Sequence, residues 1–145
     1  MTRNLLIFAL GSFLLFAVHR AQAASTIKIV VHSTSGADSI TKARVGDLFL
    51  KRATRWENGR AVTPVDQSEK SSARVAFTKD LLGKEVSWVK SYWQKMIFSG
   101  RATPPVELSS DGEVLDYIRS NPDAIGYVSE STAISGPVKF LTVRD

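Results

Sequence analysis

The sequence contains no cysteine and only two histidines, His19 and His32, among its 145 residues. Without a thiol the chain forms no disulfide and offers no thiolate as a nucleophile or metal ligand. It has neither a P-loop nor a GxGxxG motif, and no carboxylates at the spacing of a metal site. We therefore predict a binding protein with no cofactor, no metal and no catalytic residue. An exported hydrolase with a triad of serine, His32 and aspartate is the more distant alternative.

The amino-terminal segment has the three parts of a secretory signal peptide. Arg3 lies in a short polar start, an apolar run follows at residues 5–18, and the small-residue sequence Ala-Gln-Ala occupies residues 21–23. The run is shorter than the ~20 apolar residues that a membrane anchor needs, and no cysteine is present to carry a lipid. We expect residues 1–23 to be cleaved and residues 24–145 to form one periplasmic domain without stable membrane insertion.

The charge of the exported chain argues against nucleic acid as a partner. Loss of Arg3 and Arg20 lowers the formal net charge from +5 to +3. The remaining lysines and arginines are scattered along the chain and form no basic tract. The roughly 120 remaining residues are enough for a single domain with one core.

Alternating apolar patterns predict an α/β chain. Buried or extended strands are expected at residues 26–32, 61–66, 124–130 and 138–143, with Pro64 favouring a sheet edge for the second. Helices are expected after Thr41, after Ser71 or Ser72, at about residues 85–98, and after Ser110, which with Glu113 forms a capping box. Because helices alternate with strands, we predict a mostly parallel sheet flanked by helices.

The third expected helix carries a stripe of apolar residues at helical spacing, which favours packing in the core over a platform for a ligand. The stripe consists of Val86, Val89, Trp93, Met96 and Ile97, widened by Trp88 and Tyr92.

Gly126 interrupts a segment that otherwise predicts a buried strand. Glycine in a strand loses side-chain packing and backbone entropy, so its presence indicates that another part of the chain passes closely. We expect a neighbouring backbone at this position.

Two segments carry a family resemblance: Leu48–Trp56, with the sequence LFLKRATRW, and Asn121–Val128, with the sequence NPDAIGYV. In this order and at this spacing they resemble the periplasmic phosphate-binding proteins of bacterial ABC transporters, especially small single-lobe homologues. The resemblance covers about residues 27–143. It implies a single lobe of the type II periplasmic-binding-protein-like fold. It also implies that Gly126 lets its strand approach the loop after Asp66.

The function that this resemblance implies is an exported module that binds phosphate or a related oxyanion for an ABC-type uptake system. Its partner would be an ABC transporter permease or another envelope protein. The candidate site is the loop of residues 66–74, because a helix N-terminus offers free N–H groups and the positive end of the helix dipole. Ser68, Ser71 and Ser72 would donate hydroxyl hydrogen bonds beside the Arg74 guanidinium. Ordinary capping by one serine, with the others solvated, is the alternative.

The loop departs from the family pattern, in which an arginine and a Ser-Gly-Thr run precede the helix. This chain has Val65, Asp66 and Gln67 where the arginine would be, and Lys-Ser-Ser-Ala at residues 70–73. Glu69 adds a charge that repels anions. A one-sided site should bind weakly unless a partner or a second copy closes it. The alternative function is a cell-envelope interaction module that has kept the fold and lost the ligand.

Overall fold

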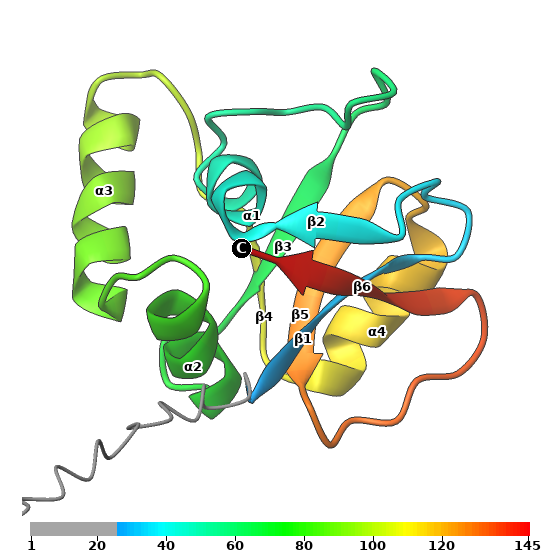
Figure 1. Ribbon diagram of the computed structural model, residues 1–145. Helices are drawn as coiled ribbons and strands as arrows, with labels where there is room; N and C mark the ends of the chain where they lie inside the picture. The colour runs from blue at the N-terminus through cyan, green and yellow to red at the C-terminus, as the bar shows by residue number, and fades with distance from the viewer. Residues whose placement is uncertain (1–25) are drawn as a thin grey trace, which may run out of the picture.

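Six strands form one sheet in the order β2-β6-β1-β5-β3-β4, with helices on both faces (Figure 1). The computed structural model describes residues 26–145, so the predicted signal peptide at residues 1–23 lies outside the described residues. None of the helices within residues 26–145 is long and apolar enough to cross a membrane. Along the chain the elements are β1 (Ile27–His32), β2 (Ser39–Thr41), α1 (Lys42–Phe49), β3 (Thr63–Gln67), α2 (Ser72–Asp80), α3 (Val86–Phe98), β4 (Val106–Leu108), α4 (Asp111–Ser120), β5 (Ala124–Ser129) and β6 (Val138–Arg144).

The sheet is mostly parallel, as predicted. The pairs β2–β6, β3–β5 and β3–β4 are parallel, whereas β1 is antiparallel to both of its neighbours, β5 and β6. Five strands therefore run in one direction and β1 alone runs against them. Thus β1, the first strand of the described residues, lies in the interior of the sheet.

The strand predictions need two corrections. The short strands β2 and β4, with three residues each, were not predicted, because so short a run shows no alternation of apolar and polar residues. Pro64 does not lie in an edge strand, since β3 is between β5 and β4. However, β4 begins opposite Val65, so Pro64 pairs only with Ile125 of β5. Its missing N–H is tolerated because no strand lies on its other side.

The predicted helix starts are confirmed by their caps. The side chains of Thr41, Ser71 and Ser110 accept hydrogen bonds from the backbone N–H groups three residues later. Glu113 also reaches back, but its carboxylate accepts from the N–H of Ser109, at 2.7 Å, rather than from that of Ser110. Each of these helices therefore begins where the sequence places a hydroxyl side chain.

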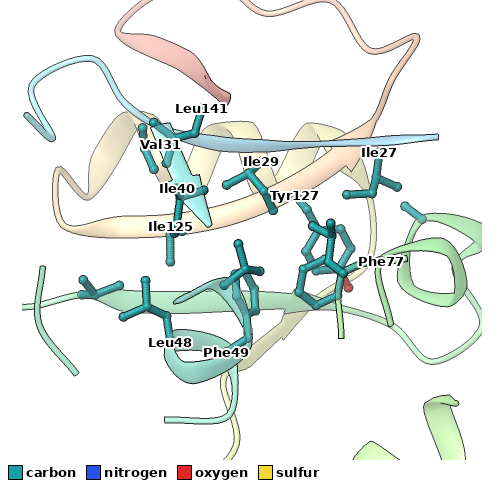
Figure 2. Close-up of a cluster of buried hydrophobic side chains, with 14 of the residues drawn as sticks. Ile27, Ile29, Val31, Ile40, Leu48, Phe49, Phe77, Ile125, Tyr127 and Leu141 are labelled. Atoms are coloured by element: carbon teal, nitrogen blue, oxygen red, sulfur yellow. The ribbon is translucent and has the colours of Figure 1, made fainter. Parts of the chain in front are cut away.

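Helices α1 and α2 cover one face of the sheet, and α4 covers the other. Ile29 and Val31 of β1 point toward α1 and α2, whereas Val30 between them points toward α4. Figure 2 shows the first of these clusters, in which Phe77 of α2 lies against Tyr127 of β5. Their rings stack with centroids 4.0 Å apart and planes at 2°. The inner strands β1 and β5 are buried on both faces, which accounts for their nearly continuous apolar sequences.

Gly126 has a close neighbour, but not the one expected. A Cβ atom at this position would lie 2.7 Å from Cγ1 of Val114 in α4 and 3.0 Å from Cγ2 of Val65 in β3. The expectation of a neighbouring backbone, the loop after Asp66, is therefore wrong. The missing side chain instead lets α4 pack directly onto the sheet.

Helix α3 stands away from the sheet, on the outer side of α2 and of the end of α1 (Figure 1). It is held by buried Val89 and Trp93 against Leu50, whose carbonyl oxygen accepts a hydrogen bond of 2.8 Å from the Tyr92 hydroxyl. The predicted core packing holds for Val89 and Trp93, whereas Ile97 of the same stripe is 52% exposed. A helix that rests on other helices alone buries a narrower stripe than one that lies on a sheet.

Candidate functional site

The predicted oxyanion loop joins the carboxyl end of β3 to the N-terminus of α2. A single hydrogen bond of 2.8 Å, from Gln67 Nε2 to Asp111 Oδ1, ties it to the first turn of α4. The first turns of two helices therefore meet at the end of one strand. Such ends of parallel strands are where α/β proteins place ligands.

The three candidate serines differ in what they can offer a ligand. Ser71 is the N-cap of α2: its hydroxyl donates to Gln67 Oε1 at 2.8 Å and accepts from the N–H of Arg74 at 3.3 Å. Ser68 is half-buried, and its hydroxyl accepts from the N–H of Lys70 at 3.5 Å. Ser72 is exposed, and its hydroxyl has no hydrogen-bond partner among residues 26–145. Ser72 is thus the serine most accessible to a ligand.

Arg74 is buried inside the site, with only 5% of its surface exposed. Its Nη1 forms an ion pair with Asp66 Oδ2 and lies 3.4 Å from the carbonyl oxygen of Gln67, to which it donates. Its Nε has no hydrogen-bond partner within the described part of the chain. Burial lowers the pKa of Arg74, although the nearby Tyr127 and Glu107 oppose this shift. The positive charge of Arg74, which the sequence predicted would face a ligand, is therefore already compensated by the carboxylate of Asp66.

The same carboxylate organises a second buried group. Tyr127, on the neighbouring strand β5, donates its hydroxyl hydrogen to Asp66 Oδ1. The backbone N–H of Gln67 is shared between Asp66 Oδ1, at 2.9 Å, and the Tyr127 hydroxyl oxygen, at 3.1 Å. Burial raises the pKa of Tyr127, so the phenol stays protonated and remains a donor. Asp66 thus bridges α2 and β5.

Gln67 and Asp111 organise the site, although the sequence analysis assigned them no ligand role. Gln67 Nε2 donates to the carbonyl oxygen of Tyr127 at 2.9 Å as well as to Asp111. Asp111 Oδ2 accepts from the Thr132 hydroxyl at 2.6 Å and from the N–H of Ser129 at 3.1 Å. The departure from the family pattern at Gln67 was visible in the sequence. Its partners, which lie on two other elements, were not.

The pKa of Asp111 makes this network sensitive to acid. Burial alone would raise the pKa, but hydrogen bonds from Thr132, Gln67 and Ser129 outweigh burial and hold it below its usual range. The folded-state pKa is therefore lower than the unfolded value of about 3.9. The resulting stabilisation is present above that value and is lost as the pH falls through the folded-state pKa.

Replacing Asp111 with asparagine should therefore lower the free energy of unfolding by about 1 kcal/mol at neutral pH. The difference between the two proteins should shrink below about pH 4, where the carboxylate of the original protein is itself being protonated. Urea unfolding at several pH values measures it. Asp116→Asn is the control, because that side chain is 76% exposed on the same helix and, in the described part of the chain, pairs only with Arg119. A difference that stayed constant at low pH would show that the charge of Asp111 is not its source.

The backbone at the start of α2 is the remaining group that could meet a ligand, at exposed Ser72 and at Ala73, which is only 4% exposed. The amide N–H groups of Ser72 and Ala73 make no hydrogen bond within residues 26–145, while that of Arg74 is capped by Ser71. Helix N-termini with free N–H groups bind anions. The site can therefore offer two amides and the Ser72 hydroxyl, with little net positive charge from side chains.

Several solved structures of transport proteins share the fold of this chain. The chain superposes on a protein of Clostridium perfringens, described as a phosphate ABC transporter substrate-binding protein and solved with bound phosphate, with a TM-score of 0.64 and 18% identity. The TM-score is 0.64 and the identity 16% for an ABC-type phosphate transport receptor of Vibrio cholerae. For PstS of Borrelia burgdorferi the TM-score is 0.62 and the identity 14%. No family model and no curated protein matches the chain.

Each superposition covers 81% of this chain but only 44%, 46% and 47% of the C. perfringens, V. cholerae and B. burgdorferi proteins, respectively. The chain thus spans less than half the length of the proteins it resembles. At these identities the likeness shows the fold: a mixed α/β unit of the periplasmic-binding-protein type, with a mostly parallel sheet flanked by helices. The expected fold class is confirmed.

Proposed function

We propose that this chain is an exported, periplasmic binding module that binds phosphate or a related oxyanion at the N-terminus of α2, as part of an ABC-type phosphate uptake system. The observation that carries the proposal is the pair of unbonded amides at Ser72 and Ala73, beside the exposed Ser72 hydroxyl. It is supported by a fold shared with a protein that was solved with bound phosphate. Ser68 and Ser71 complete the ligand shell in this proposal, and Arg74 contributes from behind them.

The binding should be weak. Asp66 offsets the charge of Arg74, and Glu69 lies exposed in the same loop. An interaction with an exposed helix end contributes about 0.3 to 1 kcal/mol, whereas a millimolar dissociation constant already requires about 4 kcal/mol. The two amides and one hydroxyl must supply the rest. We therefore expect millimolar affinity unless a partner covers the site.

The second candidate is an interaction module of the cell envelope that does not bind a ligand. Two observations favour it: the closed pair of Arg74 and Asp66, and two neighbouring apolar side chains at the end of α3, Ile97 and Phe98, that are 52% and 92% exposed. Large apolar residues exposed in this way mark protein contact sites when they occur in patches. Here the partner would be a transporter permease or another envelope protein.

Phosphate should raise the melting temperature more than chloride does at the same ionic strength, because a ligand that binds only the native state stabilises it. At ten times the dissociation constant the gain is about 1.4 kcal/mol, or several degrees for a domain of this size. Thermal unfolding in a phosphate series measures the shift. Ser72→Ala should reduce it, because this change removes an exposed hydroxyl that has no other partner in the described structure.

Ser87→Ala is the matched control, since Ser87 is also an exposed serine in the first turn of a helix, α3. It should leave the phosphate-specific shift unchanged. A phosphate effect no larger than that of chloride would reject oxyanion binding and leave the interaction module as the better proposal.

A further inference from the structure

A hollow lies away from the loop of residues 66–74 that precedes α2 (the α2 loop), between the end of α1, the start of β3 and the segment that leads from α3 to β4. In Figure 1 this segment passes beside α1 on its way to the sheet. The hollow, here called the Lys51 hollow, has a volume of about 350 Å³ and is walled by valines, prolines and an alanine. Its polar lining consists of Lys51, Thr54, Thr63 and Thr103, and no acidic residue of the described chain lines it. No residue of the α2 loop borders it either.

Lys51 has an unusual backbone conformation. Its φ of 52° makes it the one non-glycine residue with positive φ in residues 26–145. It follows the C-cap of α1, Leu50, and its N–H donates to the carbonyl oxygen of Leu48 at 3.1 Å. Glycine is the favoured residue at this position, because a side chain is strained in the left-handed region. The chain has a lysine here, and strained residues of this kind are often found at functional sites.

The amine of Lys51 lacks a counter-ion in the described structure. Its Nζ lies 3.5 Å from the carbonyl oxygen of Pro104, which is the one hydrogen bond it makes there, although an ammonium group has three donors. The Lys51 side chain is half-buried, and this partial removal from water lowers its pKa. Near the end of α1, the carbonyl oxygen of Asp47 already accepts from the N–H groups of Arg52 and Ala53. An anion in the hollow would therefore gain a charged hydrogen bond.

From this geometry we propose that the Lys51 hollow binds a small organic monocarboxylate, meaning one carboxylate carried on a compact apolar body. The carboxylate is held by Lys51 Nζ and by threonine hydroxyls, and the apolar body lies against Val62, Pro105 and Val106. A single cation matches a single negative charge, and the apolar walls favour an organic ligand over an inorganic ion. The volume lies at the lower end of the roughly 300 to 1,000 Å³ that is usual for small-molecule sites.

Benzoate is a suitable probe, because it combines one carboxylate with a small apolar ring. We expect benzoate to raise the melting temperature of the purified protein beyond the effect of chloride at equal ionic strength. Benzamide, which has the same shape without the charge, should not. Acetate, which lacks the ring, should bind at least ten times more weakly than benzoate.

Lys51→Gly is the decisive variant, because it removes the amine and the backbone strain together. The variant should melt about 3 °C higher than the original protein without ligand, and it should lose the benzoate shift. Lys95→Gln is the control for loss of one positive charge, since Lys95 is exposed on α3 and does not line the hollow. It should keep the benzoate shift.

Three outcomes would overturn the proposal. The first is a benzoate shift that survives in Lys51→Gly, and the second is no benzoate effect in the original protein. The third is displacement of benzoate by an equal concentration of phosphate, which would identify the hollow as a site for inorganic anions. None of these results depends on whether phosphate binds at the N-terminus of α2, so the two proposals can fail separately.

Discussion

Replacing Asp66 with alanine should lower the free energy of unfolding by about 3 to 5 kcal/mol, the range measured when one partner of a buried ion pair is removed. The pair is buried on both sides, with Asp66 7% and Arg74 5% exposed. Without the carboxylate, the Arg74 guanidinium is left in the interior without a counter-ion, and the Tyr127 hydroxyl loses its acceptor. Urea unfolding at neutral pH measures the loss.

Two further variants test whether the loss comes from the burial of the ion pair or from charge pairing alone. Asp38→Ala removes a carboxylate that pairs with Lys139 at 2.7 Å but is 93% exposed, so it should cost less than about 1 kcal/mol. The double change Asp66→Leu with Arg74→Met should recover much of the loss, because apolar side chains can replace a buried pair. If Asp66→Ala cost no more than Asp38→Ala, the pair would not be buried in solution as it is in the structure.

Replacing Gly126 with valine should cost about 1 to 3 kcal/mol, or roughly 4 to 12 °C in melting temperature, despite the higher strand propensity of valine. The new Cβ would lie 2.7 Å from a methyl group of Val114, a distance at which the Val114 side chain or one of the two elements must shift. Because α4 packs on the sheet through this contact, the added side chain would push α4 away from the face of the sheet that it covers. Thermal unfolding measures the effect.

Gly112→Ala is the matched control for Gly126, because a Cβ at Gly112 meets only the Ser110 hydroxyl, at 3.7 Å. That change, within α4, should be neutral or slightly stabilising. Combining Gly126→Ala with Val114→Ala should cost less than the sum of the two single changes, since the second makes room for the first. Additive costs would show that Val114 is not the neighbour that excludes a side chain at Gly126.

Local signals in the sequence were sufficient for most of the fold. The hydroxyl caps at Thr41, Ser71 and Ser110 fixed three helix starts, because capping depends on residues only three positions apart. Apart from the three-residue strands β2 and β4, which are too short to show a pattern, the failures concern contacts between distant segments. The neighbour of Gly126 and the exposed side of α3 both depend on how the helices and strands pack together. A short sequence pattern does not predict such packing.

The candidate site shows the same division. The sequence identified the loop at the start of α2 and its cap, Ser71, but not the state of Arg74. That state depends on Asp66 and on Tyr127, which lies 61 residues from Asp66 along the chain and is brought to it by the pairing of β3 with β5. Because Arg74 pairs with Asp66, its side chain is buried in the interior, whereas the sequence predicted that it would face a ligand.

The reversed strand at the centre of the sheet has a consequence for the order in which the chain can fold. β1 is made first, yet its partners are β5 and β6, so Ile27 pairs with Ser129 and Val31 pairs with Ile125 and Lys139. Contacts between such distant residues slow folding, because a long loop must close before they form. The centre of the sheet therefore cannot assemble until nearly the whole chain is available. A chain that stopped before β6 would leave β2 without its partner and one edge of β1 open to pairing with other molecules.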